Sequence, residues 1–76
     1  MERDISLLAI ILPVRPRPIN ESALRELTDD IRLNYLRERI TVRRAGHRYR
    51  LLDGLYRVEA FKRLGHRMIP ARIIEE

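Results

Sequence analysis

The 76-residue chain contains no cysteine, no tryptophan and only one lysine. Without cysteine it has no disulfide framework, no thiolate ligand for a metal and no thiol nucleophile. We therefore expect an intracellular, cytoplasmic protein. Domains near this length already bury only about 60% of their unfolded surface, so the chain cannot be divided further. Residues 1–76 are expected to form a single domain.

Long apolar runs are also missing. The longest, residues 7–12, is far shorter than the ~20 residues of a membrane-spanning helix. The segment before it lacks the basic flank of a signal peptide. We expect no membrane partner. Residues 5–12 are apolar on both faces, which predicts a strand buried in the middle of a sheet with helices packed against it.

Familiar cofactor motifs are absent as well. The sequence has no G-x-x-x-x-G-K loop, no G-x-G-x-x-G and no internal repeat. His47 and His66 lack neighbours that would complete a zinc set, so we expect surface turns and no metal site. Asp29 and Asp30 point about 100° apart on a helix, which favours a solvated face over a metal or acid–base pair.

Positive charge is plentiful, and it is concentrated in the second half. Residues 1–36 carry five basic and six acidic side chains, and residues 37–76 carry eleven and five, giving net charges of −1 and +6. Fifteen of the sixteen basic residues are arginine, whose planar guanidinium suits phosphate. Adaptation to heat also enriches charged residues. Composition alone therefore does not decide for nucleic-acid binding.

Hydrophobic periodicity predicts the first half of the domain after its opening strand. Residues 13–18 alternate with proline and form an extended connector, which displays Arg15 and Arg17 to solvent or to a phosphate. A first helix follows, with Asn20 or Ser22 as its N-cap. Its buried stripe is expected to contain Leu24, Leu27 and Ile31, with Leu33 or Tyr35 next to them.

The second half reads as a hairpin, a helix and a strand. Residues 40–44 and 48–52 alternate around a short turn, which is typical of a β-hairpin. A second helix has Leu55, Val58, Phe61 and Leu64 on one face and ends at Gly65. Residues 68–74 form a last strand, in which Pro70 requires an edge or a strand start. The order β-α-β-β-α-β predicts an α+β (mixed α/β) domain with a mixed sheet.

Alternation along the hairpin separates its apolar and basic residues. If Ile40, Val42, Tyr49 and Leu51 face the core, the opposite face carries Arg43, Arg48 and Arg50. Two interpretations of this strip stay open. The charges either protect a sheet edge from aggregation or bind the phosphates of a nucleic acid.

The turn into the second helix predicts an anion site. Asp53 is expected to cap this helix, and Gly54 allows a ligand to approach the backbone. The first amides of a helix have no intrahelical partner, and Arg57 projects from the same turn. We expect Gly54, Leu55, Tyr56 and Arg57 to bind a phosphate or a nucleotide.

The same residues carry a family resemblance. Asp53-Gly54-Leu55-Tyr56-Arg57, followed by Glu59-Ala60, Leu64-Gly65 and Ile69-Pro70-Ala71, resembles the D-G-x-x-R-x-x-A…L-G…I-P-a pattern of the ParB-like nuclease domain. This domain belongs to the ParB/sulfiredoxin superfamily, and the resemblance covers most of the chain. It implies a small ParB-like fold in which Gly54 and Arg57 hold a nucleotide phosphate or assist contacts to DNA.

Leu55 departs from the family pattern. Sulfiredoxins have a catalytic cysteine in this box, so their reductase activity is excluded here, and ParB segregation proteins have a glutamate. ParB proteins also continue into a helix-turn-helix DNA reader, which we expect to be missing.

Two functions are predicted. The first is a DNA-binding module that contacts phosphates through Arg43, Arg48, Arg50 and Arg57. The alternative is a nuclease or a nucleotide-dependent phosphotransferase, with Asp53 and Glu59 as catalytic candidates and a nucleotide with magnesium as cofactor. Exposed tyrosines at Tyr35, Tyr49 and Tyr56 would support a homodimer, although the core also needs them.

Overall fold

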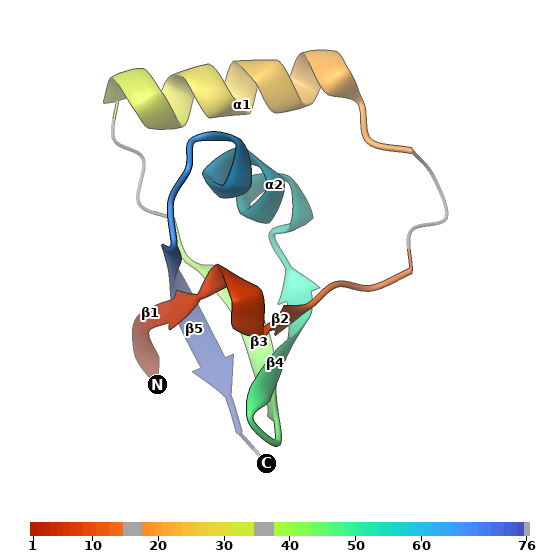
Figure 1. The fold of residues 1–76 in the computed structure, drawn as a ribbon, viewed down its shortest axis with the longest axis vertical. Helices are drawn as coiled ribbons and strands as arrows, with labels where there is room; N and C mark the ends of the chain where they lie inside the picture. Colours follow the sequence, from red (N-terminus) through yellow and green to blue (C-terminus); the bar gives the residue numbers. More distant parts are fainter. Residues whose placement is uncertain (15–17, 35–37, 76) are drawn as a thin grey trace.

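Two helices lie together at one end of a five-stranded mixed sheet in the computed structural model of the chain (Figure 1). The structure describes residues 1–14, 18–34 and 38–75. Predictions made for Arg15, Arg17 and Tyr35 therefore lie outside the described residues. The elements are β1 (Glu2–Ser6), the 3-10 helix η1 (Leu7–Ala9), β2 (Ile10–Ile11), α1 (Glu21–Asn34), β3 (Ile40–Ala45), β4 (Arg48–Asp53), α2 (Leu55–Arg63) and β5 (Met68–Ile74).

The sheet has the strand order β1-β5-β3-β4-β2. β1 is antiparallel to β5 and β3 to β4, whereas β3 pairs with β5 and β2 with β4 in parallel. The predicted α+β class and order of elements are confirmed. The placement of residues 5–12 in mid-sheet was wrong, because this segment is divided by η1 and supplies both edge strands. Ser6 starts the division, since its hydroxyl accepts a hydrogen bond from the Leu8 amide at 3.2 Å.

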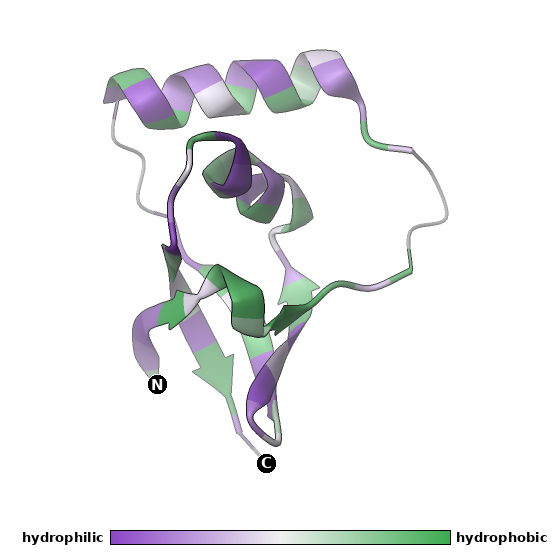
Figure 2. Cartoon of the chain, in the orientation of Figure 1, coloured by the Kyte–Doolittle hydropathy of each residue, from purple (hydrophilic) through white to green (hydrophobic). Residues whose placement is uncertain are grey.

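The short connection between the two edges requires a curled sheet. Four spacings of about 4.8 Å would separate the first and fifth strands of a flat sheet by about 19 Å. Ser6 and Ile10 are four residues apart, and four residues of extended chain span at most about 14 Å. Figure 1 shows η1 passing in front of the central strands, and Figure 2 shows that this segment is strongly hydrophobic.

The core lies inside the curled sheet and beneath α2. Alternation along the hairpin is as predicted, with Ile40, Val42, Tyr49 and Leu51 all buried. β1 and η1 add Ile5 and Leu7, and the helices and β5 complete the core with Leu24, Ile31, Val58, Ala60, Phe61, Ile69, Ala71 and Ile73. Leu33 is 76% exposed and so does not extend the stripe of α1. None of the helices in the described residues is long and apolar enough to cross a membrane.

The predicted N-cap of α1 and the predicted C-terminal glycine of α2 are both found. Asn20 is the cap of α1, because its Oδ1 accepts a hydrogen bond from the Ala23 amide at 3.0 Å. Gly65 follows α2 with φ of +79°. Its amide donates to the Lys62 carbonyl at 3.1 Å, and the His66 amide donates to the Phe61 carbonyl at 3.0 Å. This is the Schellman arrangement expected of a glycine after a helix.

Pro70 lies in β5, which has a neighbour on each side, whereas we expected an edge or a strand start. Met1 and Ile73 exchange two backbone hydrogen bonds, at 2.6 and 3.1 Å. Because bonded and non-bonded pairs alternate in an antiparallel ladder, Pro70 falls in a non-bonded pair with Asp4. The ladder with β3 begins only at Ala71. The missing proline N–H therefore removes no ladder hydrogen bond.

Candidate functional site

Three arginines line the face of the hairpin that points away from the core, and we call them the outer strip: Arg43, Arg48 and Arg50. Arg43 lies directly opposite Arg50 across the β3–β4 ladder, and Arg48 lies opposite Ala45. Arg48 and Arg50 are exposed, while Arg43 is half-buried. The strip therefore places three guanidinium groups on one face of the hairpin.

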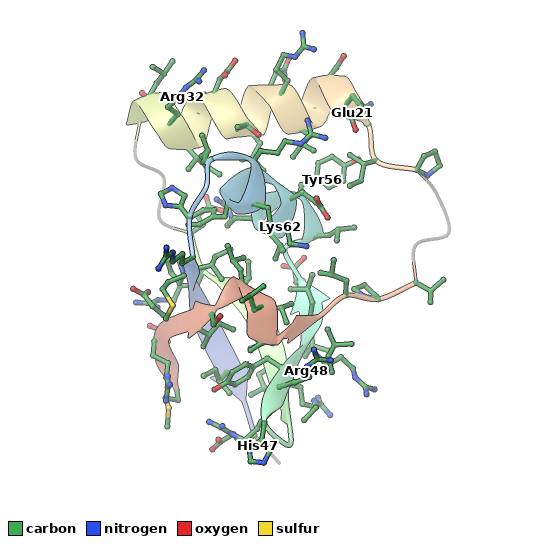
Figure 3. All side chains as sticks on the ribbon, in the orientation of Figure 1. Glu21, Arg32, His47, Arg48, Tyr56 and Lys62 are labelled. Carbon is green, nitrogen blue, oxygen red and sulfur yellow. The ribbon has the colours of Figure 1, made fainter. Side chains whose placement is uncertain are left out.

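Two arginines of the outer strip, Arg48 and Arg50, have no acidic partner among the described residues. Within residues 1–14, 18–34 and 38–75, Arg48 and Arg50 form no hydrogen bond or ion pair with another side chain. β2 pairs with β4 at Tyr49 and Arg50, so Arg48 lies beyond the end of this short edge strand. Figure 3 shows Arg48 and His47 at the end of the molecule farthest from the helices. The basic surface is thus open at the tip of the hairpin.

The N-terminus of α2 is uncapped. Gly54 occupies the N-cap position with φ of +111° and has no side chain to cap with. The Asp53 cap that we predicted was wrong, because Asp53 is the last residue of β4 and pairs with Thr41. The first intrahelical bond runs from the Val58 amide to the Gly54 carbonyl at 3.0 Å. In the described part of the chain, no side chain bonds the three preceding amides.

Gly54 has a packing reason of its own. A Cβ atom at this position would lie 2.6 Å from Cγ2 of Ile40. The close approach that requires glycine is therefore to β3, and approach by a ligand remains a prediction.

Arg57 projects from the first turn of α2 toward the segment that precedes β3. Its Nη2 donates to Oε2 of Glu38 at 3.0 Å. The Arg57 side chain is 13% exposed, whereas that of Glu38 is 76% exposed. Nη1 of Arg57 is buried, and it makes no hydrogen bond to any described residue. Arg57 is thus held apart from the outer strip by a carboxylate that sequence reasoning missed.

Tyr56 links the two helices. Its hydroxyl accepts a hydrogen bond from the Asn20 amide at 2.6 Å, and Figure 3 shows it close to the start of α1. A second link joins Arg63 to Glu21 at 2.9 Å. These contacts connect residues 36 and 42 positions apart, and no local pattern predicts them.

The two catalytic candidates have different surroundings. Asp53 is exposed and Glu59 is half-buried. Among the residues that the structure describes, no three potential ligands are close enough to hold a metal ion. Asp29 pairs with Arg32 at 2.7 Å on the exposed face of α1. His47 and His66 are both exposed, as predicted for turn residues.

Comparisons with known proteins find relatives of the same fold. The model of the family described as the ParB N-terminal domain matches residues 3–76. Sulfiredoxin from Arabidopsis thaliana is 30% identical with a TM-score of 0.89, covering 100% of this chain and 86% of that one. No curated protein matches.

Two structures of the C-terminally truncated chromosome-partitioning protein ParB from Caulobacter crescentus are also similar. The one complexed with CTP-γ-S is 25% identical with a TM-score of 0.85, over 100% of this chain and 45% of that one. The one complexed to the centromeric parS site is 23% identical with a TM-score of 0.81, over 96% and 40%. This chain therefore spans less than half of either ParB chain. With the fold and the family model in agreement, the chain belongs to the ParB N-terminal domain family.

Proposed function

We propose that this domain binds DNA by contacting the phosphate backbone, mainly through the outer strip. The observation that carries the proposal is the direct opposition of Arg43 and Arg50 on an exposed sheet face, with Arg48 beside them. Arginine side chains that contact DNA phosphates displace condensed counterions from the duplex, and this release favours binding. The similarity to a ParB that is complexed to parS supports DNA as the polyanion.

The proposed contacts are made to phosphates and not to base edges, so they are expected to be independent of sequence. Phosphate contacts position a protein on the duplex without specifying bases. Three such contacts predict that log affinity falls with log salt at a slope of about −2.7, which is about 40-fold between roughly 50 and 200 mM salt.

Fluorescence anisotropy with a short labelled duplex at two salt concentrations tests this proposal. Arg50→Gln should weaken binding and reduce the salt slope by about 0.9, because one phosphate contact is lost. Arg25→Gln on the exposed face of α1 removes the same charge and should leave the slope nearly unchanged. Absence of binding, or binding that is indifferent to salt, would refute the proposal.

A second candidate function is nucleotide binding at the N-terminus of α2. The uncapped amides of Leu55, Tyr56 and Arg57 point out of a helix whose dipole favours anions. The buried Nη1 of Arg57 adds a donor that has no described partner. The 25% identical ParB complexed with CTP-γ-S supports a nucleoside triphosphate as the ligand. Magnesium would reach this site together with the nucleotide phosphates.

Catalysis at the same place would need one of the two nearby carboxylates. Asp53 directly precedes the uncapped turn, and Glu59 lies on α2. Incubation with plasmid and magnesium, and separately with labelled ATP, tests nuclease and phosphotransfer activity. Activity that Asp53→Ala and Glu59→Gln both leave intact would come from a contaminant.

A further inference from the structure

A second basic site lies at the opposite end of the hairpin from α2. There, a cleft of about 450 Å³ is lined by Arg43, Arg44, Gly46 and Glu75. It forms because β5 pairs with β3 only as far as Arg43, so no described residue pairs with the last two residues of β3 on this side. About five residue steps of β4, roughly 17 Å, separate this cleft from the turn into α2. The cleft and the N-terminus of α2 are thus distinct sites.

Arg44 is held in a fixed position beside the cleft. Its Nε donates to Oε1 of Glu75 at 2.7 Å. Its guanidinium carbon lies 5.3 Å from the centre of the Tyr49 ring, and Nη1 lies 3.5 Å from the Tyr49 hydroxyl. The hydrogen bond to Glu75 raises the pKa of Arg44, and the Tyr49 hydroxyl adds to this effect. Arginine is charged at every physiological pH in any case, so these contacts fix the position of a permanent positive charge.

The contact with Glu75 shows that an oxyanion fits against Arg44. The carboxylate is 49% exposed and the arginine 39%. Exposed ion pairs contribute little to stability, so exchanging Glu75 for another anion costs the fold little. Arg43 lines the same cleft. A dianion beside two arginines gains more electrostatic attraction than a single carboxylate does.

We propose that this cleft is a phosphate-binding site, and that Glu75 occupies it until a ligand phosphate takes its place on Arg44. The volume is within the range of about 300–1,000 Å³ that small-ligand sites have. The ligand is a phosphate group, carried either by a DNA backbone or by a nucleotide. The inference goes beyond the proposed function, because it holds for free phosphate even if DNA does not bind.

Two-dimensional ¹⁵N NMR with inorganic phosphate, at ionic strength held constant with chloride, tests the site directly. We expect saturable shifts of the Gly46 amide and of the Arg44 Nε–H. Arg44→Gln should abolish the Gly46 shift, and the charge-matched Arg25→Gln should keep it. Glu75→Gln removes the competing carboxylate and should tighten phosphate binding roughly two- to fivefold, the worth of an exposed ion pair.

Any of three results would refute the phosphate site. The chemical shift of the Gly46 amide does not change with phosphate, or it still changes in Arg44→Gln, or Glu75→Gln binds phosphate more weakly. The last variant keeps the test decisive even if Arg44→Gln fails to fold. Parallel titrations with duplex DNA and with CTP identify the source of the phosphate. If phosphate changes the Gly46 chemical shift but the domain does not bind DNA, only the proposed function is refuted. If the domain binds DNA but phosphate leaves the Gly46 chemical shift unchanged, only the cleft site is refuted.

Discussion

Replacing Gly54 by alanine adds one methyl group where β4 turns into α2. The backbone of Gly54 has φ of +111° and ψ of 28°, in a region that L-residues rarely adopt. The new Cβ would lie 2.6 Å from Cγ2 and 3.0 Å from Cβ of Ile40. Ile40 is 1% exposed and lies at the start of β3. It therefore has no open space into which it can move.

The expected loss of stability is the sum of a backbone and a packing contribution. A left-handed conformation costs a residue with a Cβ roughly 1–2 kcal/mol, and overpacking a filled core costs typically about 1–3 kcal/mol. Gly54→Ala should thus lower the free energy of unfolding by about 2–5 kcal/mol. At about 0.05–0.15 kcal/mol per residue, the total for a domain of this size is only about 4–11 kcal/mol.

Urea denaturation followed by circular dichroism measures this loss, and two other glycines serve as controls. Gly46 and Gly65 have φ of +65° and +79°, and a Cβ at either would meet nothing within 4 Å. Alanine at these positions should carry the backbone contribution only. The difference between Gly54→Ala and either control therefore contains the contact with Ile40, which we expect to cost about 1–3 kcal/mol, together with any extra backbone cost of the wider φ at Gly54.

A partial rescue provides the second check on the same reasoning. Leucine has no Cγ2 methyl group on its β-carbon, so Ile40→Leu should relieve part of the clash in the double variant. We expect a coupling energy of about 0.5 kcal/mol or more, in the range seen for residues in contact. If Gly54→Ala is no more destabilising than Gly65→Ala, or if Ile40→Leu gives no coupling, then Ile40 is not what requires glycine here. Close approach by a ligand would become the better explanation.

Three further changes test individual contacts. Asn20→Ala removes the cap of α1 and should lower the unfolding free energy by about 1 kcal/mol in urea denaturation. Asp53→Ala should change it by less than about 0.5 kcal/mol, because Asp53 caps no helix; a loss near 1 kcal/mol would show that it caps α2 in solution. Glu38→Gln should strengthen CTP binding roughly two- to fivefold by calorimetry, since the carboxylate competes for Arg57, and Arg57→Gln should abolish it. Weaker binding in Glu38→Gln would show instead that Glu38 positions Arg57.

Most of the fold follows from local pattern, because most of its elements bury one periodic face. The alternation of β3 and β4 placed their four core residues correctly, and the spacing on α2 placed Val58 and Phe61. Asn20 caps α1 because its side-chain oxygen accepts a backbone hydrogen bond, and Gly65 ends α2 because a residue without a Cβ adopts a positive φ easily. The first strand did not follow. The apolar run does not show that Leu8 is 89% exposed, or that Leu7–Ala9 turns and carries the chain from one sheet edge to the other.

The candidate site divides in the same way, between what neighbours along the chain determine and what distant residues determine. The outer strip follows from a period of two, and the turn into α2 follows from Gly54. The anions that hold the arginines do not. Glu38 lies 19 residues from Arg57, and Glu75 lies 31 residues from Arg44. Only the fold brings each pair together. In both cases an exposed carboxylate holds a better-shielded guanidinium, so an external phosphate competes at each place with a group of the chain itself. Affinity at either site is then set by the strength of that internal pair as well as by the positive charge that composition reveals.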